Sequence, residues 1–178
     1  MKNTSSQKTI FKADLFSVKE IKFLSSTGKK KIHNIAKRNS TVSVFPLTEA
    51  YDIYLVSQYR DTLGKIALEA VAGFIDGNET TLAAAKRELK EEAGISAAQW
   101  EELARIEIAS SVFKGINHLF LAKGLEKTLQ NLQDDEEIKV IKMSLEDAVG
   151  KVMSGEINVS SSVIGILLLD KLRKEKKI

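Results

Sequence analysis

The 178-residue chain contains no cysteine, which excludes a disulfide framework, a thiolate metal site and a cysteine nucleophile. The same absence fits a reducing compartment, and we expect a cytoplasmic protein. The N-terminal segment Met1–Lys8 is polar and lacks the apolar stretch of a signal peptide. The longest apolar run, Val163–Leu169, is far shorter than the roughly 20 residues that a membrane-spanning helix requires. We therefore expect no membrane association.

The chain also lacks a strong charge of one sign. Its formal net charge is +3, with basic runs at residues 29–31 and 173–177 and acidic runs at residues 88–92 and 134–137. A nucleic-acid-binding protein more often shows one basic face interleaved with aromatic residues. The basic runs here are short and far apart, so we expect them to be solvated. No nucleic-acid partner is predicted.

Alternating apolar residues predict most of the strands. Residues 10–23 and 31–37 are expected to form an antiparallel strand pair within an N-terminal extension, residues 1–40. The main domain, residues 41–178, begins with a hairpin formed by residues 41–47 and 51–58. Further strands are expected at residues 103–108, 118–122 and 138–143.

Capping residues and glycines predict three helices. Thr80 or Thr81 caps a helix that runs to Ala93 and is closed by Gly94. Two more helices fit Leu145–Met153 and Ser161–Lys174, and serines are expected to cap the last of them. Strands on both sides of a helix indicate an α+β fold of the α/β/α sandwich type.

The most informative segment, residues 73–95, reads GFIDGNETTLAAAKRELKEEAGI. Glu88, Glu91 and Glu92 are spaced i, i+3 and i+4, so they share one face of the predicted helix. Three crowded carboxylates repel each other unless they are well solvated or a cation lies among them. Ligands that are all oxygen suit Mg²⁺, or Mn²⁺, rather than zinc.

Other residues of this helix have structural expectations. Arg87 precedes Glu91 by four residues and is expected to hold its carboxylate in place. The apolar residues Leu82, Leu89 and Ala93 are expected to dock on the sheet. The plain alternative is a charged solvent-exposed face in which Lys86, Arg87 and Lys90 neutralise the glutamates.

The segment resembles the Nudix box, a glycine and a glutamate followed by an Arg-Glu-hydrophobic-any-Glu-Glu-any-Gly-hydrophobic run. Every defined position matches, at Gly73, Glu79, Arg87, Glu88, Leu89, Glu91, Glu92, Gly94 and Ile95. Seven of these are fixed letters, so a chance match in one chain is below about one in 10⁵. The resemblance implies a Nudix α/β/α sandwich with a mixed sheet, which hydrolyses nucleoside diphosphates linked to another moiety with the help of divalent metals.

Site roles follow from the resemblance position by position. Glu88 and Glu92 would be the principal metal ligands, and Glu91 a third ligand or an outer-shell catalytic group. The carbonyl of Ala72 would complete the metal site. Arg87 and Glu79 would be a structural pair that braces the loop against the helix.

The flanking segments resemble the ADP-ribose pyrophosphatase branch of the family. Gln58-Tyr-Arg60 and Leu68-Glu69-Ala-Val-Ala-Gly73 carry this resemblance, which makes Gln58, Arg60 and Glu69 candidate substrate-binding residues. The branch also implies a homodimer in which the N-terminal strands exchange between subunits. The acidic segment 134–137 resembles a loop that supplies a metal ligand and the general base. Glu136 is the first candidate and Asp134 the second, with a solvated acidic loop as the alternative.

One segment departs from that branch. Residues 109–117 read ASSVFKGIN, without the proline and the glutamate that the branch usually carries there. The substrate therefore stays open between ADP-ribose and another nucleoside-diphosphate derivative, such as a GDP-sugar or a dinucleotide. A catalytically impaired nucleotide-binding module is the alternative from a different functional class.

Overall fold

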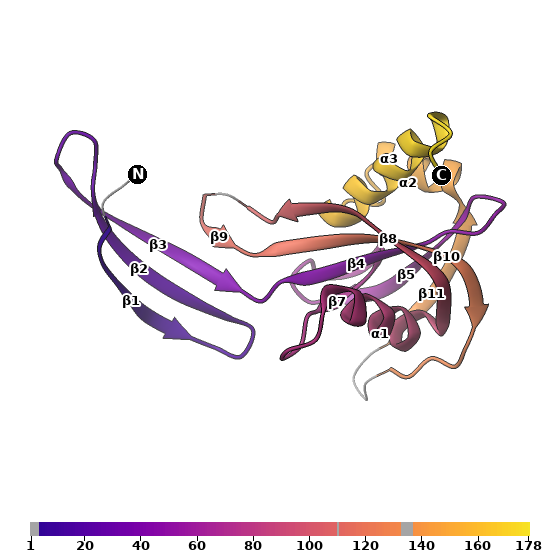
Figure 1. Ribbon diagram of the computed structural model, residues 1–178, viewed down its shortest axis with the longest axis horizontal. Coiled ribbons are helices and arrows are strands. Elements are labelled where there is room, and N and C mark those ends of the chain that lie inside the picture. Colours follow the sequence, from indigo (N-terminus) through magenta and orange to yellow (C-terminus); the bar gives the residue numbers. More distant parts are fainter. Residues whose placement is uncertain (1–3, 110, 133–136) are drawn as a thin grey trace. The chain divides into compact units, whose positions relative to one another are not determined.

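The structure is a computed structural model that describes residues 4–109, 111–132 and 137–178 (Figure 1). The chain forms two compact units. The first unit contains Met1–Ser40 and Ile106–Asn117, and the second contains Thr41–Arg105 and His118–Ile178. The predicted division into residues 1–40 and 41–178 stays a prediction. Residues 106–117 lie in the same unit as residues 1–40. Among the described residues, no helix is long and apolar enough to cross a membrane.

The first unit is a four-stranded sheet in the order β1-β2-β3-β9. Its strands are β1 (Thr4–Lys12), β2 (Phe16–Leu24), β3 (Lys30–Arg38) and β9 (Phe113–Lys114). The first three strands are antiparallel neighbours, and β9 pairs in parallel with β3. The predicted N-terminal antiparallel strands are present, but the expected single strand over residues 10–23 was wrong, because the chain turns between Lys12 and Phe16 and forms two strands there. A tight turn at Gly28, where φ is +79°, leads from β2 into β3.

One face of this small sheet is rich in lysine. The register aligns Lys12 with Ser17, Ser17 with Lys37, and Lys37 with Lys114, so these four residues form one cross-strand row. Two more lysines, Lys19 and Lys31, lie on the same face because residues two apart along a strand point the same way. No carboxylate occupies this face in the described strands of the sheet.

The second unit contains two sheets and all three helices. Its strands are β4 (Thr41–Pro46), β5 (Asp52–Arg60), β6 (Lys65–Glu69), β7 (Val71–Phe74), β8 (Ile95–Glu107), β10 (Ile116–Lys127) and β11 (Lys139–Ser144), and its helices are α1 (Thr81–Ala93), α2 (Leu145–Met153) and α3 (Ser160–Lys174). The strand orders are β7-β4-β10-β8 and β11-β5-β6. The ends of β8 and β10 continue into the first unit.

Strand β4 packs against helices on both of its faces. Val42 and Val44 belong to the core cluster that includes Leu89 of α1. Phe45 points to the opposite face, where an added Cβ at Gly165 of α3 would overlap its ring. Figure 1 likewise shows α1 on one side of the strands and α2 and α3 on the other. This is the predicted α+β fold of the α/β/α sandwich type.

The predicted helix ends are largely confirmed. Thr80 caps α1 by accepting a hydrogen bond from the Ala83 N–H at 3.1 Å, and Gly94 ends the helix in the left-handed conformation, with φ 60°. Helix α2 spans the predicted residues 145–153. The expected serine cap of α3 was wrong, because its N-cap is Val159 and no side chain makes a capping hydrogen bond there.

The predicted buried face of α1 needs one correction. Leu89 and Ala93 are buried, as expected, but Leu82 is 37% exposed. The residues that do face the core are Ala84, Ala85, Glu88, Leu89, Glu92 and Ala93. Ala84 and Ala85 take the place predicted for Leu82. Because alanine side chains are small, the helix lies close to the sheet, and Glu88 and Glu92 share its inner face.

Candidate active site

Helix α1 buries two of the three predicted ligand carboxylates. Glu88 and Glu92 are buried, with 9% and 5% of the residue exposed. The Glu88 side chain is 11% exposed, whereas the Glu91 side chain is 31% exposed. Ionised carboxylates are rarely buried unless they are paired or bind a cation. The spacing therefore does not produce a simple solvated face, and the plain alternative of three solvent-exposed glutamates is wrong for Glu88 and Glu92.

Strand β7 provides the surface that these two carboxylates contact. The Ala72 N–H donates a hydrogen bond to Glu92 Oε2 at 3.0 Å. A Cβ added at Gly73 would overlap the Glu88 carboxylate. Only glycine leaves room for the Glu88 side chain directly against the strand. This steric requirement explains why the first position of the motif is a glycine.

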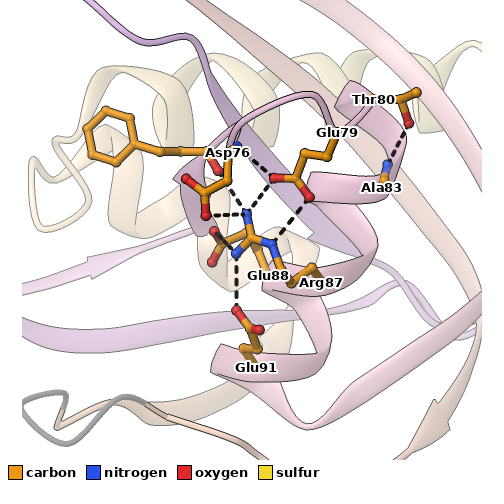
Figure 2. Close-up of polar contacts among 8 residues, drawn as sticks. Asp76, Glu79, Thr80, Ala83, Arg87, Glu88 and Glu91 are labelled. Carbon is orange, nitrogen blue, oxygen red and sulfur yellow. Dashed lines mark hydrogen bonds and ion pairs between the residues drawn. The ribbon is translucent and has the colours of Figure 1, made fainter. Parts of the chain in front are cut away.

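The guanidinium of Arg87 ties α1 to the loop that precedes it, as Figure 2 shows. Its Nη2 donates to Glu79 Oε1 at 2.7 Å and to the Phe74 carbonyl at 2.9 Å. The Asp76 N–H also donates to Glu79 Oε1, at 2.8 Å. These bonds hold the loop between β7 and α1 on the first turns of the helix, and Arg87 and Glu79 form the contact that the resemblance implied.

The same guanidinium also bonds two of the candidate ligands (Figure 2). Arg87 Nη1 donates to Glu88 Oε1 at 2.7 Å and to Glu91 Oε2 at 3.1 Å. The predicted contact between Arg87 and Glu91 is therefore present. Hydrogen bonding to Glu79, and then to Glu88 and Glu91, raises the pKa of Arg87, and the bond from Arg87 lowers the pKa of Glu79. Both groups are held in their charged forms.

The carboxylates are close to one another but are not arranged around a shared central point. In the part of the chain that the structure describes, no three His, Asp or Glu side chains form a group that could hold a metal ion. Glu88 and Glu91 turn toward the Arg87 cation, and Glu92 turns toward the Ala72 N–H. The candidate ligands nevertheless fit a hard divalent ion, since every candidate ligand atom is an oxygen. The missing side chain of Gly73 leaves space that the Glu88 carboxylate occupies. The ligand roles of Glu88, Glu91, Glu92 and the Ala72 carbonyl stay predictions.

The three candidate substrate-binding residues share one face of the sheet β11-β5-β6. The register pairs Gln58 with Ala67 and Val56 with Glu69, so Gln58, Arg60 and Glu69 point to the same side. Arg60 Nε donates to Glu69 Oε1 at 2.6 Å, and Glu69 is 4% exposed. The Arg60 side chain thus folds back along the sheet past the Gln58–Ala67 pair.

Gln58 is the least satisfied of these side chains. Its Nε2 is buried and has no hydrogen-bond partner among the described residues. A buried amide N–H without an acceptor is unfavourable, so an acceptor atom of a ligand would stabilise this group. The role of Gln58 in substrate binding stays a prediction.

Residues 128–131 attach the chain to the end of α1. The Thr128 N–H donates to the Gly94 carbonyl at 2.7 Å, the Asn131 N–H donates to the Glu91 carbonyl at 3.1 Å, and Gln130 Nε2 donates to the Glu92 carbonyl at 2.6 Å. No periodic pattern in the sequence signals this attachment. The predicted base candidates Asp134 and Glu136 follow directly and lie outside the described residues.

The comparison with known families decides the identity. A model of the NUDIX domain matches residues 37–161, which is well over half of the chain. The chain belongs to the Nudix hydrolase family. The matched region contains α1, its preceding loop and strands β4 to β7, so it includes every described site residue discussed above.

Two relatives of this Nudix hydrolase are equally similar to it. The methanol dehydrogenase activator of Bacillus methanolicus is 30% identical over 170 residues, with 92% of each chain covered. The ADP-ribose pyrophosphatase of Bacillus subtilis (strain 168) is also 30% identical over 170 residues, with 92% of each chain covered. The fold is also that of a solved structure titled an ADP compounds hydrolase, with a TM-score of 0.85, 20% sequence identity, and coverage of 99% of this chain and 97% of the other.

Proposed function

We propose that this Nudix hydrolase cleaves the diphosphate of ADP-ribose, or of a related nucleotide sugar, into a nucleoside monophosphate and a sugar phosphate. The observation that carries the proposal is the placement of two buried carboxylates, Glu88 and Glu92, against strand β7. This strand begins two residues after Glu69. The similarity along almost the whole chain to an ADP-ribose pyrophosphatase supports this substrate class.

The proposed metal site uses Glu88, Glu92, Glu91 and the carbonyl of Ala72, with Mg²⁺ as the first candidate ion and Mn²⁺ as the second. A bound divalent ion would neutralise the diphosphate and lower the pKa of the attacking water. The protein's own part is to hold the ligand side chains in place. Arg87 does this for Glu88 and Glu91, while the Ala72 N–H orients Glu92.

Substrate binding is proposed for the face that carries Gln58, Arg60 and Glu69. Glu69 fixes the Arg60 guanidinium through Nε, which leaves the two terminal nitrogens of the guanidinium able to contact phosphate oxygens. Arginine suits such a contact because its planar fork can make paired hydrogen bonds to a phosphate group. The buried Gln58 Nε2 is a second donor on this face.

A carboxylate from residues 134–136 is proposed as the general base, with Glu136 first and Asp134 second. The support is the anchor at Asn131, whose N–H bonds the Glu91 carbonyl. Glu136 is the fifth residue after Asn131, so the chain between them reaches at most about 18 Å. This length permits either acid to reach the last turn of α1.

A homodimer through the N-terminal unit is proposed from the charges. The first unit carries 11 Lys and Arg against 3 Asp and Glu, whereas the second carries 16 against 21. Their formal net charges are therefore +8 and −5. The directly opposed Lys37 and Lys114 repel each other, and the acidic unit of a second copy would offer an anionic surface that offsets this repulsion.

A second candidate function is activation of a dehydrogenase. It is favoured by the relative from Bacillus methanolicus, which matches as well as the pyrophosphatase does. The rate of a purified methanol dehydrogenase with and without this protein separates the two. Stimulation that persists in a hydrolytically inactive variant would support activation without hydrolysis, and no stimulation would remove this candidate.

The proposed hydrolysis is tested with a substrate panel at fixed Mg²⁺ that contains ADP-ribose, other ADP-sugars, GDP-sugars and dinucleotides. ADP-ribose among the poorest substrates would contradict the proposal. Glu92→Gln should lower kcat by at least about 100-fold, since a lost metal ligand is worth several kcal/mol. Glu101→Gln is the matched control, because Glu101 is an exposed glutamate on β8, and its activity should equal that of the wild type.

A further inference from the structure

The chain changes from one sheet to the other at a single residue, Ala70. Strand β6 ends at Glu69 and pairs with β5, whereas β7 begins at Val71 and pairs with β4. Ala70 belongs to neither strand and is 1% exposed. Its backbone N–H is out of reach of water, and a buried N–H without an acceptor is destabilising. The position therefore needs an acceptor from elsewhere in the fold.

That acceptor is Ser162 on α3. Its Oγ accepts a hydrogen bond from the Ala70 N–H at 2.9 Å, and Ser162 is itself 1% exposed. The hydroxyl lies in the first turn of the helix, where a serine usually bonds to its own backbone. Here it accepts the hydrogen bond from the sheet junction instead.

The packing of α3 on β4 sets the place of this hydroxyl. A Cβ added at Gly165 would overlap the Phe45 ring, so the helix backbone lies directly against that ring. Ser162 and Gly165 are three residues apart and share one face of the helix. Because close packing fixes α3 at Gly165, the neighbouring turn presents Ser162 at a defined position.

The junction at Ala70 connects the two halves of the proposed site. On one side, Glu69 accepts the hydrogen bond from Arg60. On the other side, the Ala72 N–H donates to Glu92. Ala72 is the third residue after Glu69, so their Cα atoms are at most about 11 Å apart. A shift of the Ala70 amide would change the distance between the substrate-binding face and the carboxylates of α1.

We infer that Ser162 is a positioning residue for the reaction, which holds the Ala70 amide and thereby sets the substrate-binding face relative to the carboxylates of α1. The inference rests on the proposed function. Ser162 acts through the backbone, because its side chain bonds the Ala70 amide. Misplacement of reacting groups by about 1 Å can lower a rate by about 100-fold, so a buried hydrogen bond far from the substrate is able to control kcat.

The kinetic test compares three variants at a temperature where each is fully folded. Ser162→Ala removes the acceptor and should lower kcat by about 10- to 100-fold, with KM changed by less than about 3-fold. Ser162→Thr keeps the hydroxyl and should retain kcat within about 3-fold of the wild type. Ser161→Ala removes the neighbouring buried serine and should match the wild type. A Ser162→Ala protein that melts earlier but keeps both constants would overturn the inference.

Two further measurements cover the case in which Ser162→Ala does not fold. Ser162→Cys keeps the size of the side chain but is a weak acceptor, so unchanged kcat in this variant would also overturn the inference. The backbone amide resonances of Ala70 and Ala72 in the same variant provide a readout that needs no turnover. Both resonances should shift. An unchanged Ala72 resonance would show that a change at Ser162 does not reach the strand that contacts Glu92, and would overturn the inference. A wild-type protein that hydrolyses no substrate of the panel would contradict the proposed function instead.

Discussion

Arg87 and Glu88 are neighbours in the chain, yet their side chains form an ion pair with 2.7 Å between Nη1 and Oε1. Adjacent residues of a helix point about 100° apart, so the arginine must curve back over the helix to make this contact. It does so because Glu79 and the Phe74 carbonyl bind the other side of the same guanidinium. Arg87 therefore supplies a positive charge among carboxylates that would otherwise repel each other.

Replacement of Arg87 should destabilise the protein. Arg87→Gln removes the bonds to Glu79, Glu88 and Glu91, and we expect the free energy of unfolding to fall by about 1.5–3 kcal/mol, the range for hydrogen bonds to charged groups. Urea denaturation without added metal measures this change. Lys86→Gln is the control, since Lys86 is exposed, and its effect should stay within about 0.5 kcal/mol. Equal denaturation midpoints for Arg87→Gln and the wild type would show that the network contributes nothing to stability.

Gly73 should tolerate no side chain. In Gly73→Ala the new methyl group would overlap the Glu88 carboxylate, so Glu88 has to move. We expect kcat to fall by at least about 10-fold, as for a misplaced reacting group, and Mn²⁺ affinity, measured by calorimetry, to weaken in parallel. Gly150→Ala is the control, because nothing lies within 4 Å of a Cβ added in that helix. It should stabilise the protein by about 0.5–1 kcal/mol and leave metal affinity unchanged.

Arg60 and Glu69 should act as one unit in substrate binding. Arg60→Ala is expected to raise KM about 10-fold or more, which corresponds to about 1.4 kcal/mol of binding energy. Glu69→Gln should raise KM less, because the arginine stays but is held less firmly. Steady-state kinetics on both single variants and the double variant give the coupling. Lys65→Ala removes the exposed cross-strand partner of Arg60 and serves as the control. Strictly additive effects of Arg60→Ala and Glu69→Gln would contradict a functional pair.

Acid should remove one identifiable contribution to stability. Hydrogen bonds from Lys174 and Arg173 lower the pKa of Asp170 below its ordinary value of 3.8. A carboxyl whose pKa is lower in the folded state stabilises the protein above its unfolded pKa, and this contribution is lost as the pH falls through the folded pKa. Asp170→Asn should therefore melt below the wild type at pH 7, and the gap should close progressively below about pH 4.

The control for this titration is Glu126→Gln, which changes an exposed carboxylate on β10. Its melting temperature should differ little from the wild type at either pH. A gap between Asp170→Asn and the wild type that stays constant down to pH 2 would mean that the variant acts through packing rather than through charge.

The local features of α1 were predictable from the sequence because they depend on neighbours along the chain. Helix caps and side-chain spacing act within a few residues. The structure accordingly has the predicted cap at Thr80, the predicted left-handed Gly94, and Glu88 and Glu92 on one face of the helix. The contact of Arg87 with Glu91 was predictable for the same reason. The resemblance to the Nudix box added the pairing of Arg87 with Glu79.

The contacts that depend on distant segments were not predictable. The expected docking of Leu82 was wrong because the sheet approaches α1 on its alanine side. Serines were expected to cap α3, but the Ser162 hydroxyl accepts its hydrogen bond from the Ala70 N–H, 92 residues away. Nothing in the serine run at residues 160–162 indicates that one of its hydroxyls bonds a strand junction in a distant part of the chain.

Pairing of β9 with β3 has a consequence for the gene. Residues 113–114 complete a sheet whose other three strands lie before Ser40. The small sheet is thus encoded in two separated stretches, and a shortened gene that starts at Thr41 would leave Phe113 and Lys114 without their neighbouring strand. Transfer of this sheet to another scaffold, or its loss during evolution, would require coordinated changes at two places in the coding sequence.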